Sequence, residues 1–344
     1  MDSTSQNKWD KFVNCHQKAR FVHLSVYKDI IEKTYGYKGY FLYGEQNEEI
    51  VFIFPFFKVK RIFLGDKFVS QPFSEYGGIL FKPDADRRQK EEIIAGLKKK
   101  DFRIEIHGQE DEVDFVSRYS GRKNLHRIAV LKLGVYENIY NGFDRQIRKS
   151  INKAKREGLK VYEDTSPESI KHKFYPLYFK HLKKKHGVPP YSLEFFLNCY
   201  RIAPQRIRIY FAEFKNKTVA ALWGFLTDNR VHISYNPSLK EYFDFRPNDL
   251  IHAEFIKWAC ENKFAYFDFG PASYSGQIYY KRKWGVDFIN QFNVGLFGEA
   301  VEGRHFSHFL VKLIKKISAF FWRYLIPSGL AKMISGSIRK KLGR

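Results

Sequence analysis

The sequence predicts a mixed α/β protein in which helices are layered on sheets, organised as two similar domains followed by a helical tail. Segments with helical periodicity alternate with short aromatic or β-branched runs of strand type in both halves of the chain. A length of 344 residues is enough for two cores, and a hydrophobic content of 44% is typical of a folded protein. We place the domains at residues 1–134 and 135–303, and the tail at residues 304–344.

The composition narrows the kinds of partner. A formal net charge of +23 favours a polyanionic partner, and nucleic acid, anionic lipid and a phosphorylated substrate all qualify. Cys15, Cys199 and Cys260 are too far apart to suggest a metal site or a disulfide framework, which favours a reducing cytoplasm. The first residues are polar rather than signal-like, and no apolar run approaches the roughly 18 residues that span a bilayer. We therefore expect any membrane contact to be peripheral.

The first half is predicted to alternate helices and strands. Residues 8–36 have apolar side chains at helical spacing and close with Gly36. The strands are expected at 40–43, 50–54, 59–64, 102–106 and 128–133, with a charged helix at 86–97 and with Pro55 ending the second strand. The loop at 70–78 holds Tyr76 followed by two glycines, which let the backbone approach another surface closely; the alternative is a plain connection.

Residues 135–158 form a basic amphipathic helix in this prediction. Phe143, Ile147, Ile151 and Ala154 fall on one face, and Gly158 stands where a helix-ending glycine belongs. The cations on the remaining surface include Arg145, Arg148 and Lys149. Such a helix either docks by its apolar stripe and offers these cations to phosphates, or is an ordinary solvated surface helix.

The rest of the second half has a recognisable order of elements. We expect strands at 159–163, 207–214, 218–228, 230–235 and 288–297, and helices at 170–185, 193–200 and 249–261. A rigid turn at 186–192 contains Tyr191 and ends in Ser192, which is placed to cap the next helix. This order of helices and strands is that of an acyltransferase-type α/β unit. The similar alternation in the first half suggests tandem copies of one fold.

The most informative segment is residues 264–285. It begins as an aromatic strand that carries Asp268, ends at Gly270 and Pro271, continues through a loop of small residues to Gly276, and closes in a cluster of tyrosines, cations and Trp284. A strand end, a glycine loop and clustered cations suit a site for an anion or a developing oxyanion. The alternative is a turn followed by a solvated basic patch.

Taken in order, these segments resemble the FemAB-like family of aminoacyl and peptidyl transferases, which are built from tandem GNAT-type domains. The similarity is greatest to compact members with a BioF2-like acyltransferase domain and runs from Trp9 to about Gly298. It rests on the FPF strand end at 54–56, the loop motifs at 70–73 and 76–78, the RQIRK helix at 145–149, the turn at 186–191, the FDFG strand end at 267–270, and Gly276 followed by YK at 280–281 and WG at 284–285.

The resemblance implies an active site in the second domain. Lys281 matches the lysine that lies beside the reacting carbonyl, where a cation stabilises the oxyanion, and the alternative is a surface lysine. Asp268 is a candidate base for the attacking ammonium, and the alternative is a turn anchor. The implied substrate-binding residues are Arg145, Arg148, Lys149, Tyr76, Tyr191, Gly276, Tyr280 and Trp284, with no metal.

The donor stays open at this point. The long helical hairpin with which some family members bind tRNA has no counterpart here, and the closest match to a pyrophosphate-binding motif is Arg118-x-x-Gly121, which leads toward a strand. The acyl donor is aminoacyl-tRNA or an acyl-CoA or acyl-carrier thioester, and the acceptor is the amine of a phosphorylated or lipid-linked envelope precursor. The alternatives are a non-catalytic RNA-binding protein and a degenerate transferase that serves as a membrane-associated scaffold.

The tail is predicted to bind an anionic membrane surface. Residues 304–344 contain Lys and Arg but no Asp or Glu, and a helical apolar stripe comprises Leu310, Leu313, Ile314, Ile317, Phe320, Phe321, Tyr324 and Leu325. Trp322 is expected at the headgroup boundary, and Pro327 separates a shorter basic helix at 330–342. The alternative is that the stripe packs on the second domain. We expect a cytoplasmic protein, peripheral at the inner face of the membrane.

Overall fold

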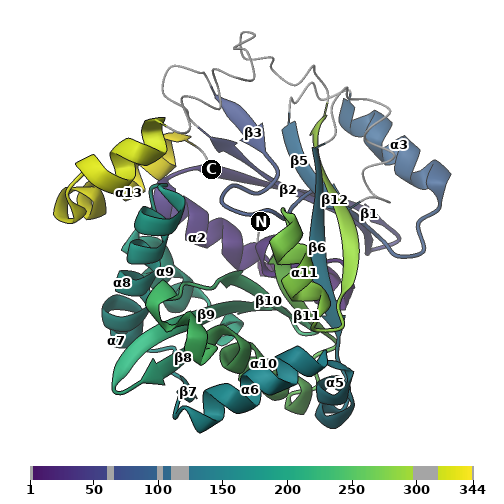
Figure 1. Ribbon diagram of the computed structural model, residues 1–344. Helices are drawn as coiled ribbons and strands as arrows, with labels where there is room; N and C mark the ends of the chain where they lie inside the picture. The colour runs from purple at the N-terminus through teal and green to yellow at the C-terminus, as the bar shows by residue number, and fades with distance from the viewer. Residues whose placement is uncertain (1–2, 60–65, 99–103, 110–123, 297–316, 343–344) are drawn as a thin grey trace. The chain divides into compact units, whose positions relative to one another are not determined.

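The computed structural model describes residues 3–59, 66–98, 104–109, 124–296 and 317–342. It is a mixed α/β fold, as expected (Figure 1). The chain divides into two compact units. Unit 1 comprises residues 1–128, 288–304 and 340–344, and unit 2 comprises residues 129–287 and 305–339. The division therefore falls near the predicted one, but the strand after residue 287 returns to unit 1 and most of the tail groups with unit 2.

Unit 1 begins with two helices where the sequence predicted one. They are α1 (Ser3–Cys15) and α2 (Ser25–Tyr35), separated by the short helix η1 (Phe21–His23). The prediction of a single helix over 8–36 is wrong, because the Asp10 carboxylate accepts hydrogen bonds from the Ser25 backbone N–H at 2.8 Å and its hydroxyl at 2.6 Å. These bonds hold the start of α2 against α1. Gly36 ends α2 in the left-handed conformation, as predicted.

The sheet of unit 1 runs in the order β1-β2-β3-β5-β12, with β4 paired to β2. Its strands are β1 (Lys38–Gln46), β2 (Glu49–Val59), β3 (Lys67–Val69), β4 (Leu80–Phe81), β5 (Ile104–Gln109) and β12 (Asp287–Leu296). Strand β2 does not end at Pro55, which was a wrong prediction. Pro55 faces Phe41 of β1 and lies between the residues of β2 that pair with β4 and with β3. A residue without an N–H is tolerated in such a gap between partners. The predicted strand at 59–64 lies mostly outside the described residues.

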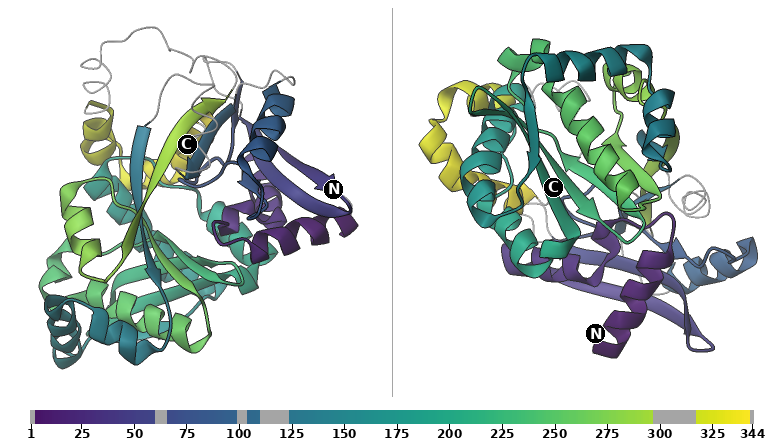
Figure 2. Two further views of the ribbon diagram at one scale, coloured as in Figure 1. Left: turned by 90° about the vertical axis from the view of Figure 1, so that its right-hand side faces the viewer. Right: turned by 90° about the horizontal axis from the view of Figure 1, so that it is seen from below.

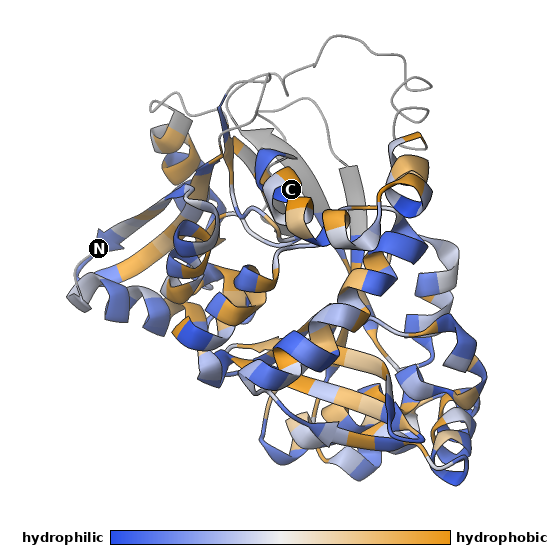
Figure 3. Cartoon of the chain, turned by 90° about the vertical axis from the view of Figure 1, so that its left-hand side faces the viewer, coloured by the Kyte–Doolittle hydropathy of each residue, from blue (hydrophilic) through white to orange (hydrophobic). Residues whose placement is uncertain are grey.

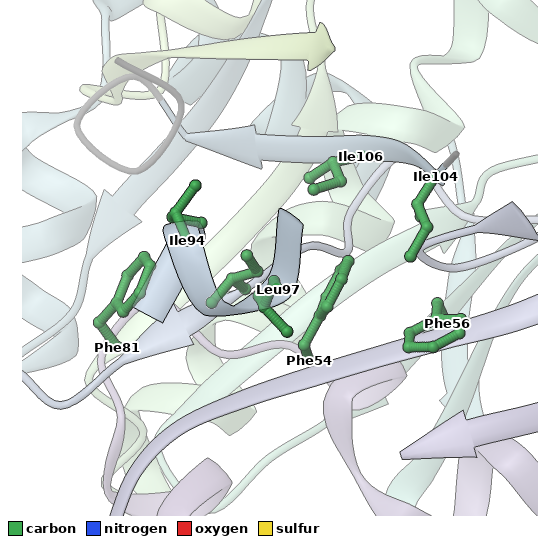
Figure 4. Packing of buried hydrophobic residues seen from close by; sticks show 8 residues of the cluster. Phe54, Phe56, Phe81, Ile94, Leu97, Ile104 and Ile106 are labelled. Carbon is green, nitrogen blue, oxygen red and sulfur yellow. The ribbon is translucent and has the colours of Figure 1, made fainter. Parts of the chain in front are cut away.

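One hydrophobic cluster of unit 1 lies between this sheet and the helix α3 (Arg87–Lys98) (Figure 4). Ile94 and Leu97 of α3 pack on strand residues and are nearly free of solvent contact. Their partners in the cluster are Phe54, Phe56, Ile79, Phe81, Ile104 and Ile106. Burial of each such side chain contributes about 1.5–3 kcal/mol relative to exposure, which fixes α3 on the sheet.

In unit 2 the strands run in the order β6-β11-β10-β9-β8-β7. They are β6 (Asn124–Lys132), which passes from unit 1 into unit 2, β7 (Lys160–Glu163), β8 (Ile207–Phe214), β9 (Lys217–Leu226), β10 (Arg230–Tyr235) and β11 (Tyr266–Pro271). Strands β7 to β10 pair antiparallel, whereas β10 and β11 are parallel. A parallel pair requires a crossover, and α10 (Pro247–Glu261) supplies it.

The helices of unit 2 position the site described below. The basic segment forms two helices, α5 (Tyr136–Gly142) and α6 (Arg145–Arg156), because Phe143 and the N-cap Asp144 interrupt it. Helix α10 packs along β8 and β9, and α6 packs on α10 (Figure 2). The remaining helices of this half are α7 (Pro167–Ser169), η2 (Ile170–Phe174), α8 (Tyr175–His181), η3 (Leu182–His186), α9 (Leu193–Ile202), η4 (Pro204–Arg206), η5 (Lys240–Phe245) and α11 (Ser275–Arg282). Ser192 caps α9 as predicted.

The described part of the tail consists of a helical turn and a second helix. Residues 317–320 are helical and continue into η6 (Phe321–Leu325), and α13 (Ser328–Leu342) follows after Pro327. The break at Pro327 and the second basic helix are thus confirmed. Leu310, Leu313 and Ile314 of the predicted stripe lie outside the described residues. No helix in the described part of the chain is both long enough and apolar enough to cross a bilayer.

Candidate active site

The segment at 264–285 forms a strand, a turn and a helix. Strand β11 runs parallel to β10 and ends through Gly270, whose φ of 73° lies in the left-handed region that a glycine enters without strain. Helix α11 then begins at Ser275, so the cluster of tyrosines and cations is helical rather than a loop. Successive residues of α11 therefore point in different directions, which separates the roles of Tyr279, Tyr280 and Lys281.

Lys281 points back to the end of β11. Its ammonium Nζ donates hydrogen bonds to the carbonyl oxygens of Phe269 at 2.7 Å, Gly270 at 3.0 Å and Pro271 at 2.6 Å. The alternative of a solvated surface lysine is therefore wrong, because the side chain is half-buried and ties α11 to the strand end. Its predicted role beside a reacting carbonyl stays a prediction. The three hydrogen bonds also give Lys281 a structural role, because they hold α11 to the end of β11.

Asp268 is completely buried. Its Oδ1 accepts a hydrogen bond of 2.8 Å from the backbone N–H of Gly270, and its Oδ2 lies 3.8 Å from the guanidinium of the buried Arg230. Both contacts hold the turn after β11. This geometry favours the alternative of a turn anchor, and a catalytic role for Asp268 stays a prediction.

A pocket of about 430 Å³ opens beside this turn, entirely within unit 2. It lies between α6, the start of α10 and α11. Four cations face one carboxylate in its lining, which consists of Gln146, Ile147, Lys149, Ser150, Lys153, Arg246, Asp249, Tyr280 and Lys283. An excess of positive charge in a concave, partly desolvated site favours an anionic ligand.

The sequence places these cations by simple helical geometry. Ile147, Ile151 and Ala154 of α6 are buried, as predicted, and Lys149 and Lys153 lie four residues apart on a flank of the same helix. Lys155 forms an ion pair of 3.0 Å with Glu254 of α10, which also holds the two helices together. The predicted docking of this helix by its apolar stripe is confirmed.

Asp249 lies in the first turn of α10 at the base of the pocket and is 6% exposed. Its Oδ1 accepts a hydrogen bond of 2.9 Å from the hydroxyl of Tyr280. Burial raises the pKa of Asp249 above its usual range, although the hydrogen bond from Tyr280 and the charge of Arg246 act in the opposite direction. A carboxylate with a raised pKa in a cationic pocket is suited to accept a proton.

A second hollow of about 360 Å³ adjoins the first and shares Gln146 and Lys283 with it. The ammonium of Lys283 donates to Gln146 Oε1 at 2.6 Å and lies 4.0 Å from the centre of the Tyr279 ring. Tyr279 is 61% exposed, so its ring offers a free face beside a row of cations. The other lining residues are Gly142, Asp144, Arg282 and Gly285.

The predicted substrate-binding residues lie in several places. Lys149 and Tyr280 line the pocket, whereas Arg145 is exposed outside both linings and Arg148 donates to the Asn141 carbonyl at 3.2 Å. Trp284 is completely buried against Phe143, which makes it a core residue rather than a contact surface.

The three remaining predicted residues also lie outside the pocket linings. Gly276 opens α11, and Tyr191 lies under the guanidinium of Arg339 at 4.7 Å. Tyr76 belongs to unit 1, where it is buried beneath the Arg20 guanidinium at 5.0 Å. The structure therefore brings together only part of the predicted set.

Sequence reasoning missed Arg246 and Asp249 and did not single out Lys283. A signal was present in the RPND sequence at 246–249, where a proline at the first helical position is followed by an acid in the first turn. Arg246 has a φ of 62°, an uncommon conformation for a residue other than glycine. It ends η5 and directly precedes α10.

Comparisons with known proteins agree with this fold. Residues 141–282 match the family model described as an acetyltransferase (GNAT) domain. The crystal structure of FemX covers 90% of this chain and 98% of its own length, with a TM-score of 0.66 and 14% sequence identity. The chain has the tandem GNAT fold of FemAB-like proteins. The resemblance drawn from the sequence motifs is thus confirmed.

Two further structures share the FemAB-like fold. The C-terminal domain of a putative lysylphosphatidylglycerol synthetase from Agrobacterium fabrum covers 95% of this chain and 98% of its own, with a TM-score of 0.55 and 9% identity. A tandem GNAT protein from the clavulanic acid biosynthesis pathway covers 87% and 97%, with a TM-score of 0.51 and 8% identity. No curated protein matches the chain by sequence. The matched domain in unit 2 is an acyltransferase domain, and it includes the lining residues of both hollows except Lys283 and Gly285, which directly follow it.

Proposed function

We propose that this FemAB-like protein is an N-acyl or aminoacyl transferase in which the pocket of unit 2 holds a phosphate group of the substrate. The main observation behind this proposal is that four cations line the pocket together with the buried carboxylate of Asp249. They are Lys149, Lys153, Arg246 and Lys283, and all but Lys283 lie within the segment that matches the GNAT domain. Aminoacyl-tRNA, acyl-CoA and acyl-carrier thioesters all carry phosphates, next to the acylated nucleoside in the tRNA and at the far end of the pantetheine arm in the thioesters. Charge-assisted hydrogen bonds from lysine and arginine suit such groups.

The second hollow supports a donor that also carries a base or a phosphate chain. Tyr279 offers a free aromatic face beside Lys283 and Arg282, and bases stack on such faces in sequence-independent nucleic-acid sites. An adenosine is present in CoA and at the 3′ end of tRNA, so both donors fit this surface. The acceptor in this proposal is the amine of a phosphorylated or lipid-linked envelope precursor.

The chain's own groups supply the proton transfers. The acceptor amine attacks the donor carbonyl and forms a C–N bond, and the nitrogen loses a proton as the C–O or C–S bond of the donor breaks. Asp249 accepts that proton, with Tyr280 orienting its carboxylate, and the leaving oxygen or sulfur is protonated in turn. Lys281 is proposed to stabilise the oxyanion from the end of α11, which requires one of its three N–H groups to leave a carbonyl oxygen of the strand end and turn to the substrate.

The test begins with binding of inorganic pyrophosphate, measured by titration calorimetry. Arg246→Gln is expected to weaken binding about tenfold, because it removes a charge-assisted hydrogen bond. Arg145→Gln is the matched control, since Arg145 is an exposed arginine of the neighbouring helix outside both linings. Equal losses in the two variants would contradict the assignment of the pocket.

Activity is then assayed with two donor classes and a panel of amine-bearing envelope precursors. Acetyl-CoA represents the thioesters, and aminoacyl-tRNA represents the esters. We expect acyl transfer from one class, detected as a mass increase of the acceptor. The absence of transfer from both classes, with pyrophosphate binding retained, would favour a non-catalytic phosphate-binding protein.

A further inference from the structure

The tail is anchored on unit 2 by a face that the sequence did not predict. Trp322 is only 4% exposed and packs with Phe179 of α8 and Ala331 of α13, so its predicted position at a headgroup boundary is wrong. The ammonium of Lys183 donates to the Arg323 carbonyl at 3.0 Å, and Arg323 Nη2 donates to the Lys185 carbonyl at 2.7 Å. Residues 317–339 of the tail are therefore held on unit 2.

The opposite face of the tail exposes large apolar side chains. Seven residues of η6, α13 and the helical turn before them are between 48% and 81% exposed: Ile317, Phe320, Phe321, Tyr324, Leu325, Leu330 and Met333. We call these seven residues the tail patch. Figure 3 shows apolar residues along this segment. The five members before Pro327 belong to the predicted apolar stripe and recur at helical spacing. They face solvent, whereas the alternative reading had the stripe packed on the second domain.

The tail patch lies in strongly basic surroundings. Residues 304–344 contain ten Lys or Arg and no Asp or Glu. Lys332, Lys340 and Lys341 of α13 are exposed, and so are Lys184 and Lys185 of η3, the helix to which Arg323 is bonded. An exposed apolar cluster of this kind is uncommon on a soluble protein and marks an interaction surface.

We propose that the tail patch docks on the surface of an anionic lipid bilayer. A lipid surface accepts both features, because aromatic and aliphatic side chains enter the acyl boundary while the lysines remain among anionic headgroups. A second copy of this chain would bring two strongly basic surfaces together. A nucleic acid would meet the lysines but leave the isoleucine, leucines and methionine without apolar partners. The inference does not rest on the proposed acyl donor, although it accords with a lipid-linked acceptor.

The structure also decides which variant tests the proposal. Deleting the tail would remove Trp322 and Ala331 from the packing of unit 2, so loss of binding after truncation could result from unfolding. Phe320→Ser/Phe321→Ser/Tyr324→Ser changes only exposed side chains and leaves Trp322 in place. Val135→Ser is the matched control, because Val135 is 63% exposed and lies at the start of α5, away from the tail in sequence.

The experiment is co-sedimentation of the full chain with vesicles of phosphatidylcholine, alone or mixed with phosphatidylglycerol. We expect binding to the mixed vesicles only, weakened by high salt. The triple variant is expected to bind at least about tenfold more weakly, since three apolar side chains no longer leave water, and Val135→Ser should bind like the wild type. Thermal unfolding of the triple variant at the wild-type temperature confirms that its fold is intact.

Two results would overturn the proposal. One is equal binding of the triple variant and the wild type to anionic vesicles. The other is a dimer in analytical ultracentrifugation that the triple variant dissociates, which would make the tail patch a contact between copies. Pyrophosphate binding in the pocket is measured on the same variants and should not change. Failure of the membrane proposal is therefore distinguishable from failure of the proposed transferase.

Discussion

Two buried aspartates of unit 2 show how similar groups serve different purposes. Asp268, within β11, has no exposed surface, and its partners include the Gly270 N–H and the buried Arg230. Asp249, at the start of α10, forms part of a pocket wall and has the Tyr280 hydroxyl as a partner. A buried polar group whose partners all lie in the protein fixes a conformation, whereas one that faces a pocket is available to a ligand.

The largest expected effect is on the free energy of unfolding, which Asp268→Asn should lower and Asp249→Asn should not. Asp268→Asn removes the charged partner of the buried Arg230, and breaking a buried ion pair typically costs about 3–5 kcal/mol. Asp249→Asn should leave stability at neutral pH unchanged or slightly raised. The pKa of Asp249 is raised by folding, so its stabilising contribution is complete only at low pH and is lost as the pH rises through the folded value.

Chemical denaturation of both variants at neutral pH measures this contrast. Loss of acyl transfer in Asp249→Asn, with its stability retained, would support the proposed proton acceptor. A large destabilisation of Asp249→Asn together with a stable Asp268→Asn would reverse the comparison and assign the anchoring role to the first turn of α10.

The next prediction concerns Lys281, which connects the turn after β11 to α11. Lys281→Met is expected to lower turnover by about 10²–10³, the typical loss for one oxyanion donor. It should also lower stability by about 1.5–3 kcal/mol, because three carbonyl oxygens lose a charged donor. A surface lysine, the alternative that the sequence left open, would show neither loss.

Turnover and thermal unfolding are compared with those of Arg282→Met, an exposed neighbour on the same helix. Normal turnover in a destabilised Lys281→Met protein would leave Lys281 a structural anchor only. Normal stability with lost turnover would instead show that the three hydrogen bonds contribute little to the folded state.

A third prediction concerns how the free energy of unfolding depends on pH, because the buried His252 packs behind the turn. His252 of α10 is 3% exposed, its ring stacks on Phe269, and its Nδ1 lies 2.7 Å from the Asn248 carbonyl. Burial, with a smaller contribution from Lys281, lowers the pKa of His252 from 6.5 to about 4. The neutral ring thus stabilises the fold above pH 6.5, and this contribution is lost as the pH falls toward 4.

From the two pKa values, His252 accounts for a loss of about 3 kcal/mol in unfolding free energy between pH 7 and pH 4. His252→Gln should therefore show a shallower decrease than the wild type over that interval, measured by denaturant titration at several pH values. His23 and His181 have pKa values that burial lowers to about 3 and about 4, so both proteins retain some acid sensitivity. Identical slopes in the two proteins would contradict a buried neutral His252.

The comparison also shows how far the sequence could lead. The order of elements and the apolar face of α6 follow from periodicity, which depends on neighbours three and four residues apart. The pocket depends on residues from 146 to 283 that meet only in the folded chain, so Arg246 and Asp249 carried no local signal beyond a helix start. The tail shows the same limit. Periodicity located its apolar stripe, but it could not tell that Trp322 faces inward while Phe320 and Phe321 face solvent.

The smallest expected effect distinguishes two adjacent cations of α6. The sequence predicts that Arg148 contacts a substrate phosphate, but its guanidinium donates to the Asn141 carbonyl and lies outside the pocket lining. The structure instead indicates Lys149 as the phosphate contact, because Lys149 lines the pocket.

Lys149→Ala should raise KM for a phosphorylated substrate about tenfold, with kcat nearly unchanged, because uniform binding is lost. Arg148→Ala should change KM less than about twofold, since an exposed hydrogen bond contributes little. Steady-state kinetics with a phosphorylated substrate and its dephosphorylated analogue measures both. If Arg148→Ala alone raises KM, the phosphate lies on the outer side of α6, and the pocket beside Asp249 serves another group.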